Sequence, residues 1–174
     1  HNPGGMVWKT EELQELESIC SANNILVVSD EIHADLLFNG QKHTPWQTIT
    51  ERSSLNSIVC MAPSKTFNIA GLSTSFVVIP DRDLKKSFDK MMEVLHIHMG
   101  NIPGAVALTA AFSHGDEWLD QLMEYIEGNY RFLESYLSLH LPKVRVMKPE
   151  ATFLVWLDFR EYGMTDKQLT EFLI

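Results

Sequence analysis

The sequence predicts an α/β fold with a mainly parallel sheet, followed by the start of a smaller α+β unit. Two observations lead to this prediction. Three short apolar runs lack polar alternation, which is typical of strands covered on both faces; they occupy residues 25–28, 58–62 and 75–79. Before and after these runs, apolar residues recur with the period of amphipathic helices.

The elements before residue 115 include both strands and helices. Residues 10–23 fit a helix that Thr10 could cap, because an apolar stripe follows two glutamates that suit its positive end. Residues 39–54 are predicted to be irregular, without a helix or strand pattern. Residues 82–95 fit an amphipathic helix, and a proline at 103 can start the next one through 104–113.

After residue 115 the pattern changes to a long helix and weaker strands. Asp116 is predicted to cap the helix, and Pro142 closes it. Residues 144–146 and 153–157 alternate between apolar and polar more clearly, which favours antiparallel strands with one covered face. Thr165 opens a final helix through a capping box.

Both ends of the sequence lie inside structural motifs. It begins in a turn, Asn2 to Gly5, and ends inside the helix that Thr165 opens, with no residue that would terminate it. We therefore interpret the sequence as an excerpt of a longer protein. We expect a domain boundary that separates residues 1–115 from residues 116–174, with the long helix as connector.

Composition excludes several classes of function. The chain has 174 residues, 45% of them hydrophobic, and a net charge of −9, which disfavours nucleic-acid binding. No apolar run approaches the roughly 20 residues of a membrane span, and no signal peptide is recognised. The two cysteines, Cys20 and Cys60, lie in apolar contexts and are interpreted as reduced thiols, as in a cytoplasmic protein.

Charged side chains follow two of the predicted strands. Asp30 follows the first and Lys65 follows the second. Because ligand sites in parallel sheets lie beyond the carboxyl ends of the strands, a carboxylate and an amine here could face one ligand. An ordinary ion pair, or two solvated strand ends, remains the alternative.

Five sequence motifs occur in a fixed order: Asn-Pro-Gly-Gly at 2–5, Ser-Asp-Glu-Ile-His-Ala-Asp-Leu at 29–36, Ala-Pro-Ser-Lys-Thr-Phe-Asn-Ile-Ala-Gly-Leu at 62–72, Gly-Asp-Glu-Trp-Leu-Asp-Gln-Leu at 115–122, and Pro-Glu-Ala-Thr-Phe-Leu-Val-Trp-Leu-Asp-Phe-Arg at 149–160. Together they resemble the fold-type I pyridoxal-phosphate enzymes of the aminotransferase class I/II superfamily. The resemblance is closest to the cystathionine β-lyase branch of MalY/PatB-type C–S lyases, and covers essentially the whole chain. It implies part of an aspartate aminotransferase-like large domain and the start of the small domain.

The resemblance also implies roles for single residues. Lys65 matches the lysine that binds pyridoxal 5'-phosphate covalently, and Asp30 matches the carboxylate that pairs with its ring nitrogen. Asn2 matches the asparagine that hydrogen-bonds the phenolic oxygen of the ring. His33 stands where aminotransferases have a tyrosine that donates to the same oxygen, with a packing role as the alternative. Ser64 either contacts the cofactor phosphate or begins a turn.

The sequence departs from the family pattern at three positions. Ser73 stands where many relatives have an arginine that binds the phosphate, Ala62 replaces a phosphate-binding serine, and Phe153 replaces a tyrosine. The glycine-rich phosphate loop and the arginine that binds the substrate carboxylate belong to parts of the family's chain beyond this sequence. We therefore expect the excerpt by itself to be catalytically inactive.

The implied activity is α,β-elimination on a sulfur amino acid such as L-cystathionine, giving a thiol, pyruvate and ammonia. An aminotransferase that uses the same Asp30 and Lys65 is the first alternative, and a non-catalytic regulatory or interaction module is the second. The family is usually homodimeric, so a homodimer is expected. No metal site is expected, because the His96–His98 pair has no cysteine or carboxylate cluster beside it.

Overall fold

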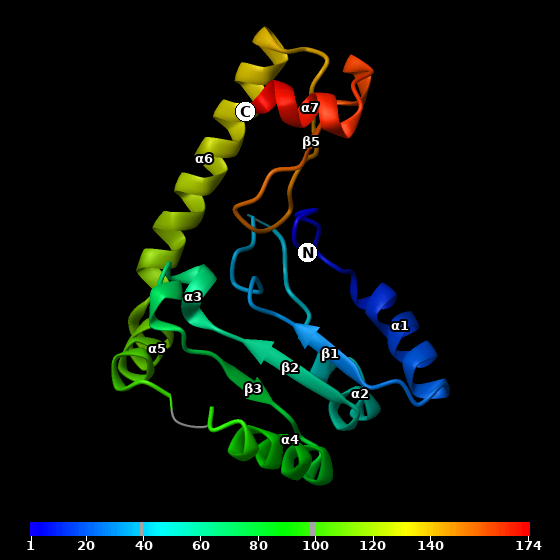
Figure 1. Cartoon of the computed structure of the whole chain (residues 1–174), viewed down its shortest axis with the longest axis vertical. Helices are drawn as coiled ribbons and strands as arrows, with labels where there is room; N and C mark the ends of the chain where they lie inside the picture. Colours follow the sequence, from blue (N-terminus) through cyan, green and yellow to red (C-terminus); the bar gives the residue numbers. More distant parts are fainter. Residues whose placement is uncertain (39, 98–99) are drawn as a thin grey trace.

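The computed structural model describes residues 1–38, 40–97 and 100–174. Its first half is built on a three-stranded sheet in the order β1-β2-β3, formed by Val27–Asp30, Ser57–Met61 and Phe76–Val78 (Figure 1). β1 and β2 are parallel, with Val27 opposite Ser57, whereas β2 and β3 are antiparallel. The third strand runs back because α3 (Pro63–Thr66) and η2 (Ala70–Leu72) reverse the chain at the end of β2.

The core of this sheet lies on one face. Leu13 of α1 (Thr10–Ala22) and Trp46 of η1 (Trp46–Thr48) pack with Val59 of β2 into one buried cluster. Val28, which points to the other face, is 61% exposed, and β3 is exposed along its length. The prediction that all three strands are covered on both faces is therefore wrong for this chain: its own elements bury only one side.

The helices lie close to their predicted ranges, but two caps differ. The residue that caps α1 is Lys9, and Thr10 is already inside the helix. The long helix α6 (Asp116–His140) likewise begins with Asp116 inside and Gly115 as its N-cap. The remaining helices of this part are α2 (Glu51–Leu55), α4 (Arg82–Val94) and α5 (Ile102–His114).

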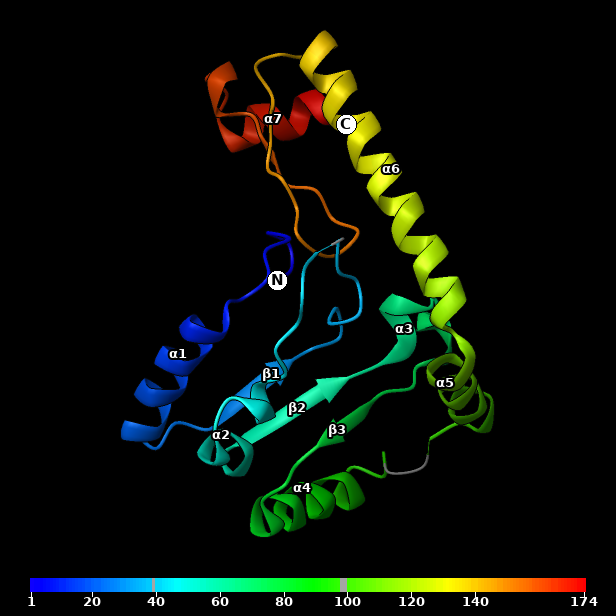
Figure 2. The same ribbon diagram turned by 180° about the vertical axis from the view of Figure 1, so that it is seen from behind.

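α6 leads from the sheet to a second, smaller group of elements, as both views show (Figures 1 and 2). This group contains an antiparallel pair, β4 (Arg145–Val146) and β5 (Leu157–Asp158), then η3 (Arg160–Tyr162) and α7 (Asp166–Leu173). The Thr165 capping box is present as predicted. The domain boundary after residue 115 stays a prediction.

Of the strand predicted at 153–157, only Leu157 is paired, as part of β5, and the bend before it makes backbone hydrogen bonds to other segments. Thr152 adopts a left-handed conformation, and its amide donates to the Leu36 carbonyl at 2.7 Å. The amides of Glu150 and Ala151 both donate to the Gly5 carbonyl, at 2.7 and 2.9 Å. These bonds hold residues 150–152 in a bend, and the paired strand β5 begins only at Leu157.

As a result, three segments that are far apart in the sequence meet beside the sheet: residues 1–7, 33–38 and 149–153. Leu36 and Thr152 are fully buried at this junction. The Glu150 carboxylate also accepts a hydrogen bond from the Val7 amide at 2.9 Å. In both ribbon views the N-terminus lies beside the loop that precedes β5 (Figures 1 and 2). No helix among the described residues is long and apolar enough to cross a membrane.

Candidate active site

A cavity of about 580 Å³ opens at the carboxyl end of β1. Its lining includes four of the five residues singled out in the sequence: Asn2, Asp30, His33 and Lys65. They come from the N-terminal turn, the end of β1, the turn after β1, and α3. The fifth, Ser64, is half-buried in α3 and does not line this cavity. The carboxyl ends of the two parallel strands thus bring the Asp30 carboxylate and the Lys65 amine to one cavity.

Asp30 is the last residue of β1 and lies opposite Cys60 of β2. Its Oδ1 accepts a hydrogen bond from the Ile32 amide at 3.2 Å, which holds the carboxylate at the start of the following turn. Burial raises the pKa of the Cys60 thiol, and the negative charge of Asp30 raises it further. Cys60 therefore stays protonated beside the carboxylate.

His33 lies in the turn that follows β1, where the Leu36 amide donates to the His33 carbonyl. Burial lowers the pKa of the imidazole, and the nearby charges of Lys65 and the terminal amine lower it further, while Asp30 opposes them. The ring packs against Phe153 with centroids 5.6 Å apart. Its Nδ1 is buried without a hydrogen-bond partner within the part of the chain that the structure describes.

Lys65 lies in α3, the short helix that starts with Pro63 directly after β2. Lys65 itself is exposed, whereas the next residue, Thr66, is fully buried. The Thr66 hydroxyl donates to Asp35 Oδ2 at 2.9 Å. The chain thus anchors α3 through Thr66 and leaves the Lys65 amine at the cavity.

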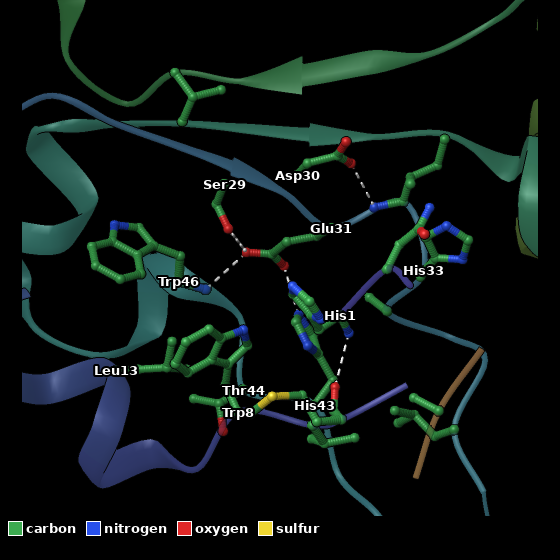
Figure 3. A pocket seen from close by; sticks show the side chains of 18 of the residues that line it. His1, Trp8, Leu13, Ser29, Asp30, Glu31, His33, His43, Thr44 and Trp46 are labelled. Atoms are coloured by element: carbon green, nitrogen blue, oxygen red, sulfur yellow. Dashed lines mark hydrogen bonds and ion pairs between the residues drawn. The ribbon is translucent and has the colours of Figure 1, made fainter. Parts of the chain in front are cut away.

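A second polar cluster, which sequence reasoning missed, surrounds Glu31. Its Oε1 accepts hydrogen bonds from the Trp46 amide at 2.9 Å and from the Ser29 hydroxyl at 3.1 Å, and its Oε2 lies 2.7 Å from Nε2 of His43 (Figure 3). Burial raises the pKa of the Glu31 carboxyl. The bonds from His43, the Trp46 backbone and Ser29 outweigh burial, so this pKa lies below its ordinary value of 4.5.

The sequence carried only one signal for this cluster. Glu31 directly follows Asp30, so it lies at the same strand end. His43 and Trp46 belong to the segment 39–54, which is predicted to be irregular, and nothing in their spacing links them to Glu31. They line the same cavity as Asp30 and Lys65.

The described residues contain no group of three or more His, Cys, Asp or Glu placed to hold a metal ion. His98 of the His96–His98 pair lies outside the described residues. Carboxylate, imidazole, hydroxyl, amide and amine groups all line the cavity. They suit an organic ligand that both accepts and donates hydrogen bonds.

Comparison with known proteins decides the family. The family model for aminotransferase class I and II matches residues 1–174. The chain belongs to this family. The mixed α/β architecture agrees with it, and the family resemblance seen in the five motifs is confirmed.

Among curated proteins of the family, this chain is similar to cystathionine beta-lyase PatB of Bacillus subtilis, at 44% identity over 98% of this chain and 44% of that protein. It is also similar to protein MalY of Escherichia coli, at 31% identity over 99% of this chain and 44% of that protein. The chain therefore spans less than half the length of these relatives.

Two solved structures share the fold. Cystalysin from Treponema denticola, which contains a pyridoxal 5'-phosphate cofactor, matches with a TM-score of 0.97 and 35% identity, over 100% of this chain and 44% of that one. The pyridoxal-phosphate-bound C–S lyase from Staphylococcus hominis, complexed with L-cycloserine, matches with a TM-score of 0.86 and 36% identity, over 95% of this chain and 40% of that one.

Proposed function

We propose that this chain forms part of a pyridoxal-phosphate-dependent C–S β-lyase that eliminates a thiol from a sulfur amino acid such as L-cystathionine. The observation that carries the proposal is the meeting of Asp30, His33 and Lys65 in one cavity of a chain from this family. The similarity to PatB and to C–S lyases of known structure supports the reaction class.

The residues of the cavity fit the cofactor. The buried Nδ1 of His33, which has no hydrogen-bond partner among the described residues, calls for a hydrogen-bonding group, because buried polar atoms are rarely left unpaired. The volume of about 580 Å³ lies in the ordinary range for small-ligand sites. Lys65 would bind the cofactor covalently, Asp30 would pair with its ring nitrogen, and Asn2 and His33 would contact its phenolic oxygen. Ser64 stays a predicted phosphate contact only.

When bound, pyridoxal phosphate supplies a conjugated ring that accepts negative charge from the substrate's Cα. Asp30 would favour that charge, because its carboxylate would keep the ring nitrogen protonated. With its amine free, Lys65 would take the proton from Cα as a general base. The products of the proposed elimination are a thiol, pyruvate and ammonia.

Aminotransfer is the second candidate, since aspartate aminotransferase of Geobacillus stearothermophilus is also similar, at 27% identity. It would use the same Asp30 and Lys65. Release of pyruvate from cystathionine without a keto-acid acceptor distinguishes the lyase from the aminotransferase.

The first experiment is cofactor trapping. The chain is incubated with pyridoxal phosphate, reduced with borohydride and digested, and the pyridoxyl group is located by mass spectrometry. We expect selective labelling of Lys65, no such label in Lys65→Ala, and only diffuse labelling of the unfolded chain. Equal labelling of all lysines would contradict the assignment of Lys65. The elimination itself is assayed with cystathionine on the full-length protein.

We further propose a homodimer in the cytoplasm. Exposed apolar side chains on α6, such as Phe132 at 70% and Leu139 at 76%, support association, and the two free cysteines support a reducing compartment. The mass of the full-length protein in solution, measured by light scattering, tests the homodimer.

A further inference from the structure

Two short segments carry the cavity's imidazole and its amine. His33 belongs to the turn after β1, and Lys65 belongs to α3 after β2. The sheet brings the two strand ends together, but neither strand reaches as far as these residues. A direct contact between the two segments would therefore constrain how His33 and Lys65 lie relative to each other.

The hydrogen bond from Thr66 Oγ1 to Asp35 Oδ2, 2.9 Å long, is such a contact. Asp35 lies two residues after His33, and Thr66 directly follows Lys65. Thr66 is fully buried, and Asp35 is half-buried. A buried hydroxyl bonded to a carboxylate is held more firmly than a solvent-exposed pair, because breaking the bond leaves a polar group without a partner.

We propose that the Thr66–Asp35 hydrogen bond is a positioning contact, which holds the turn of His33 against α3 and so sets the spacing between the imidazole and the Lys65 amine. Neither Thr66 nor Asp35 lines the cavity, so both act through their neighbours. The consequence for cofactor binding rests on the proposed function, whereas the spacing itself does not.

The spacing between His33 and Lys65 affects the pKa of the His33 imidazole, which can be measured without the cofactor. The charges that act on His33 are those of Lys65, the terminal amine and Asp30. Burial and the positive charge of Lys65 both lower the pKa of the imidazole. If α3 and the turn separate, the amine moves away and the imidazole gains solvent, so the pKa of His33 must rise.

The test is an NMR titration of His33 in the chain without cofactor. Thr66→Val has nearly the same shape as threonine but no hydroxyl, and should shift the His33 midpoint to higher pH. Thr66→Ser keeps the hydroxyl and should restore the original midpoint. Ser53→Ala is the matched control: it removes another buried hydroxyl, which bonds the Thr50 carbonyl at 2.6 Å in α2, before β2 starts. It should leave the midpoint unchanged.

A second pair of variants covers the case in which Thr66→Val does not fold. Asp35→Ala removes the acceptor at a half-buried turn position, whereas Asp35→Asn removes the charge and keeps an acceptor oxygen. We expect the shift in Asp35→Ala only. A folded Thr66→Val or Asp35→Ala chain with an unchanged His33 midpoint would overturn the proposal.

A double-mutant cycle shows whether the bond acts through Lys65. In a Lys65→Gln background the positive charge is gone and the effect of burial remains, so Thr66→Val should shift the His33 midpoint by less than it does in the original chain. If the His33 midpoint shifts of Thr66→Val and Lys65→Gln added without coupling in the double variant, Thr66 would only stabilise the fold locally, which contradicts the proposal. Failure of borohydride trapping in the full-length protein, with these results intact, would refute the proposed function and leave the positioning contact standing.

Discussion

Glu31 accepts more polar contacts than any other cavity residue discussed above. It is only 6% exposed, and its carboxylate joins the end of β1 to Ser29, to His43 and to the backbone of Trp46. A buried carboxylate is stable only when its oxygens are paired. Glu31 therefore fixes the loop that carries His43 beside Asp30, the residue that we expect to contact the cofactor.

Replacing Glu31 by glutamine should lower the free energy of unfolding at pH 7 by about 1–3 kcal/mol, since charge-assisted hydrogen bonds to a buried group are lost. The pKa of Glu31 lies below 4.5 in the folded chain. The advantage of the original chain should therefore be constant above pH 4.5 and disappear as the pH falls through that lowered pKa.

Urea unfolding of the two chains between pH 7 and pH 3 measures this difference. Glu15→Gln, at an exposed position of α1, is the control and should change the free energy by less than about 0.5 kcal/mol. A stability difference between the chains that stayed the same down to pH 3 would show that the Glu31 charge has no part in it.

At the scale of elements, the junction of α5 and α6 is fixed by aromatic packing. Phe67, which follows α3, packs its ring against Phe112 of α5 at 5.8 Å and against Trp118 of α6 at 5.6 Å between centroids. Gly115 lies between the two helices, where a Cβ would overlap the Phe67 ring and the Ala111 carbonyl. Position 115 therefore requires a glycine, because the Phe67 ring and the Ala111 carbonyl leave no room for a side chain.

Gly115→Ala should therefore destabilise the chain by roughly 1–3 kcal/mol, as overpacking does. Gly128 lies at an exposed position in the middle of the same helix α6, where a Cβ would meet nothing within 4 Å, so Gly128→Ala is the control. This second change should stabilise the helix by up to about 1 kcal/mol, because alanine has the higher helix propensity. Thermal unfolding of both variants measures these changes in stability. If both substitutions raised or both lowered the unfolding temperature, the close approach at Gly115 would be refuted.

At the scale of the whole molecule, the first residues of the chain are joined to the loop before β5. Gly5 has a φ of +68°, and its carbonyl accepts the amides of Glu150 and Ala151. A Cβ at Gly5 would lie 3.0 Å from the Pro149 Cβ. This junction closes one side of the cavity, since Asn2 and Ala151 both line it.

Gly5→Ala should weaken the junction and speed hydrogen exchange at the amides of Glu150 and Ala151. The new Cβ would be strained by the positive φ and would lie too close to Pro149. Gly163→Ala is matched for backbone strain, with a φ of +65°, but nothing lies within 4 Å of its Cβ position. It should leave exchange at Glu150 and Ala151 unchanged. Equal exchange in the two variants would show that the close contact with Pro149 is unimportant.

The sequence by itself determined the order and type of most elements and the family of the chain. Apolar runs located β1 and β2, and capping signals located the last helix, because these features depend on residues close together along the chain. The five motifs also identified Asn2, Asp30, His33 and Lys65, which the fold brings to one cavity.

Tertiary structure alone decided which backbone groups meet across long sequence separations. It placed β3 antiparallel, bent residues 149–153 onto Gly5 and Leu36, and joined Glu31 to His43. It also paired Asp35 with Thr66, although both segments were visible as motifs. Such contacts have no local signature, because a buried polar group accepts whichever partner the packed chain brings within hydrogen-bond distance.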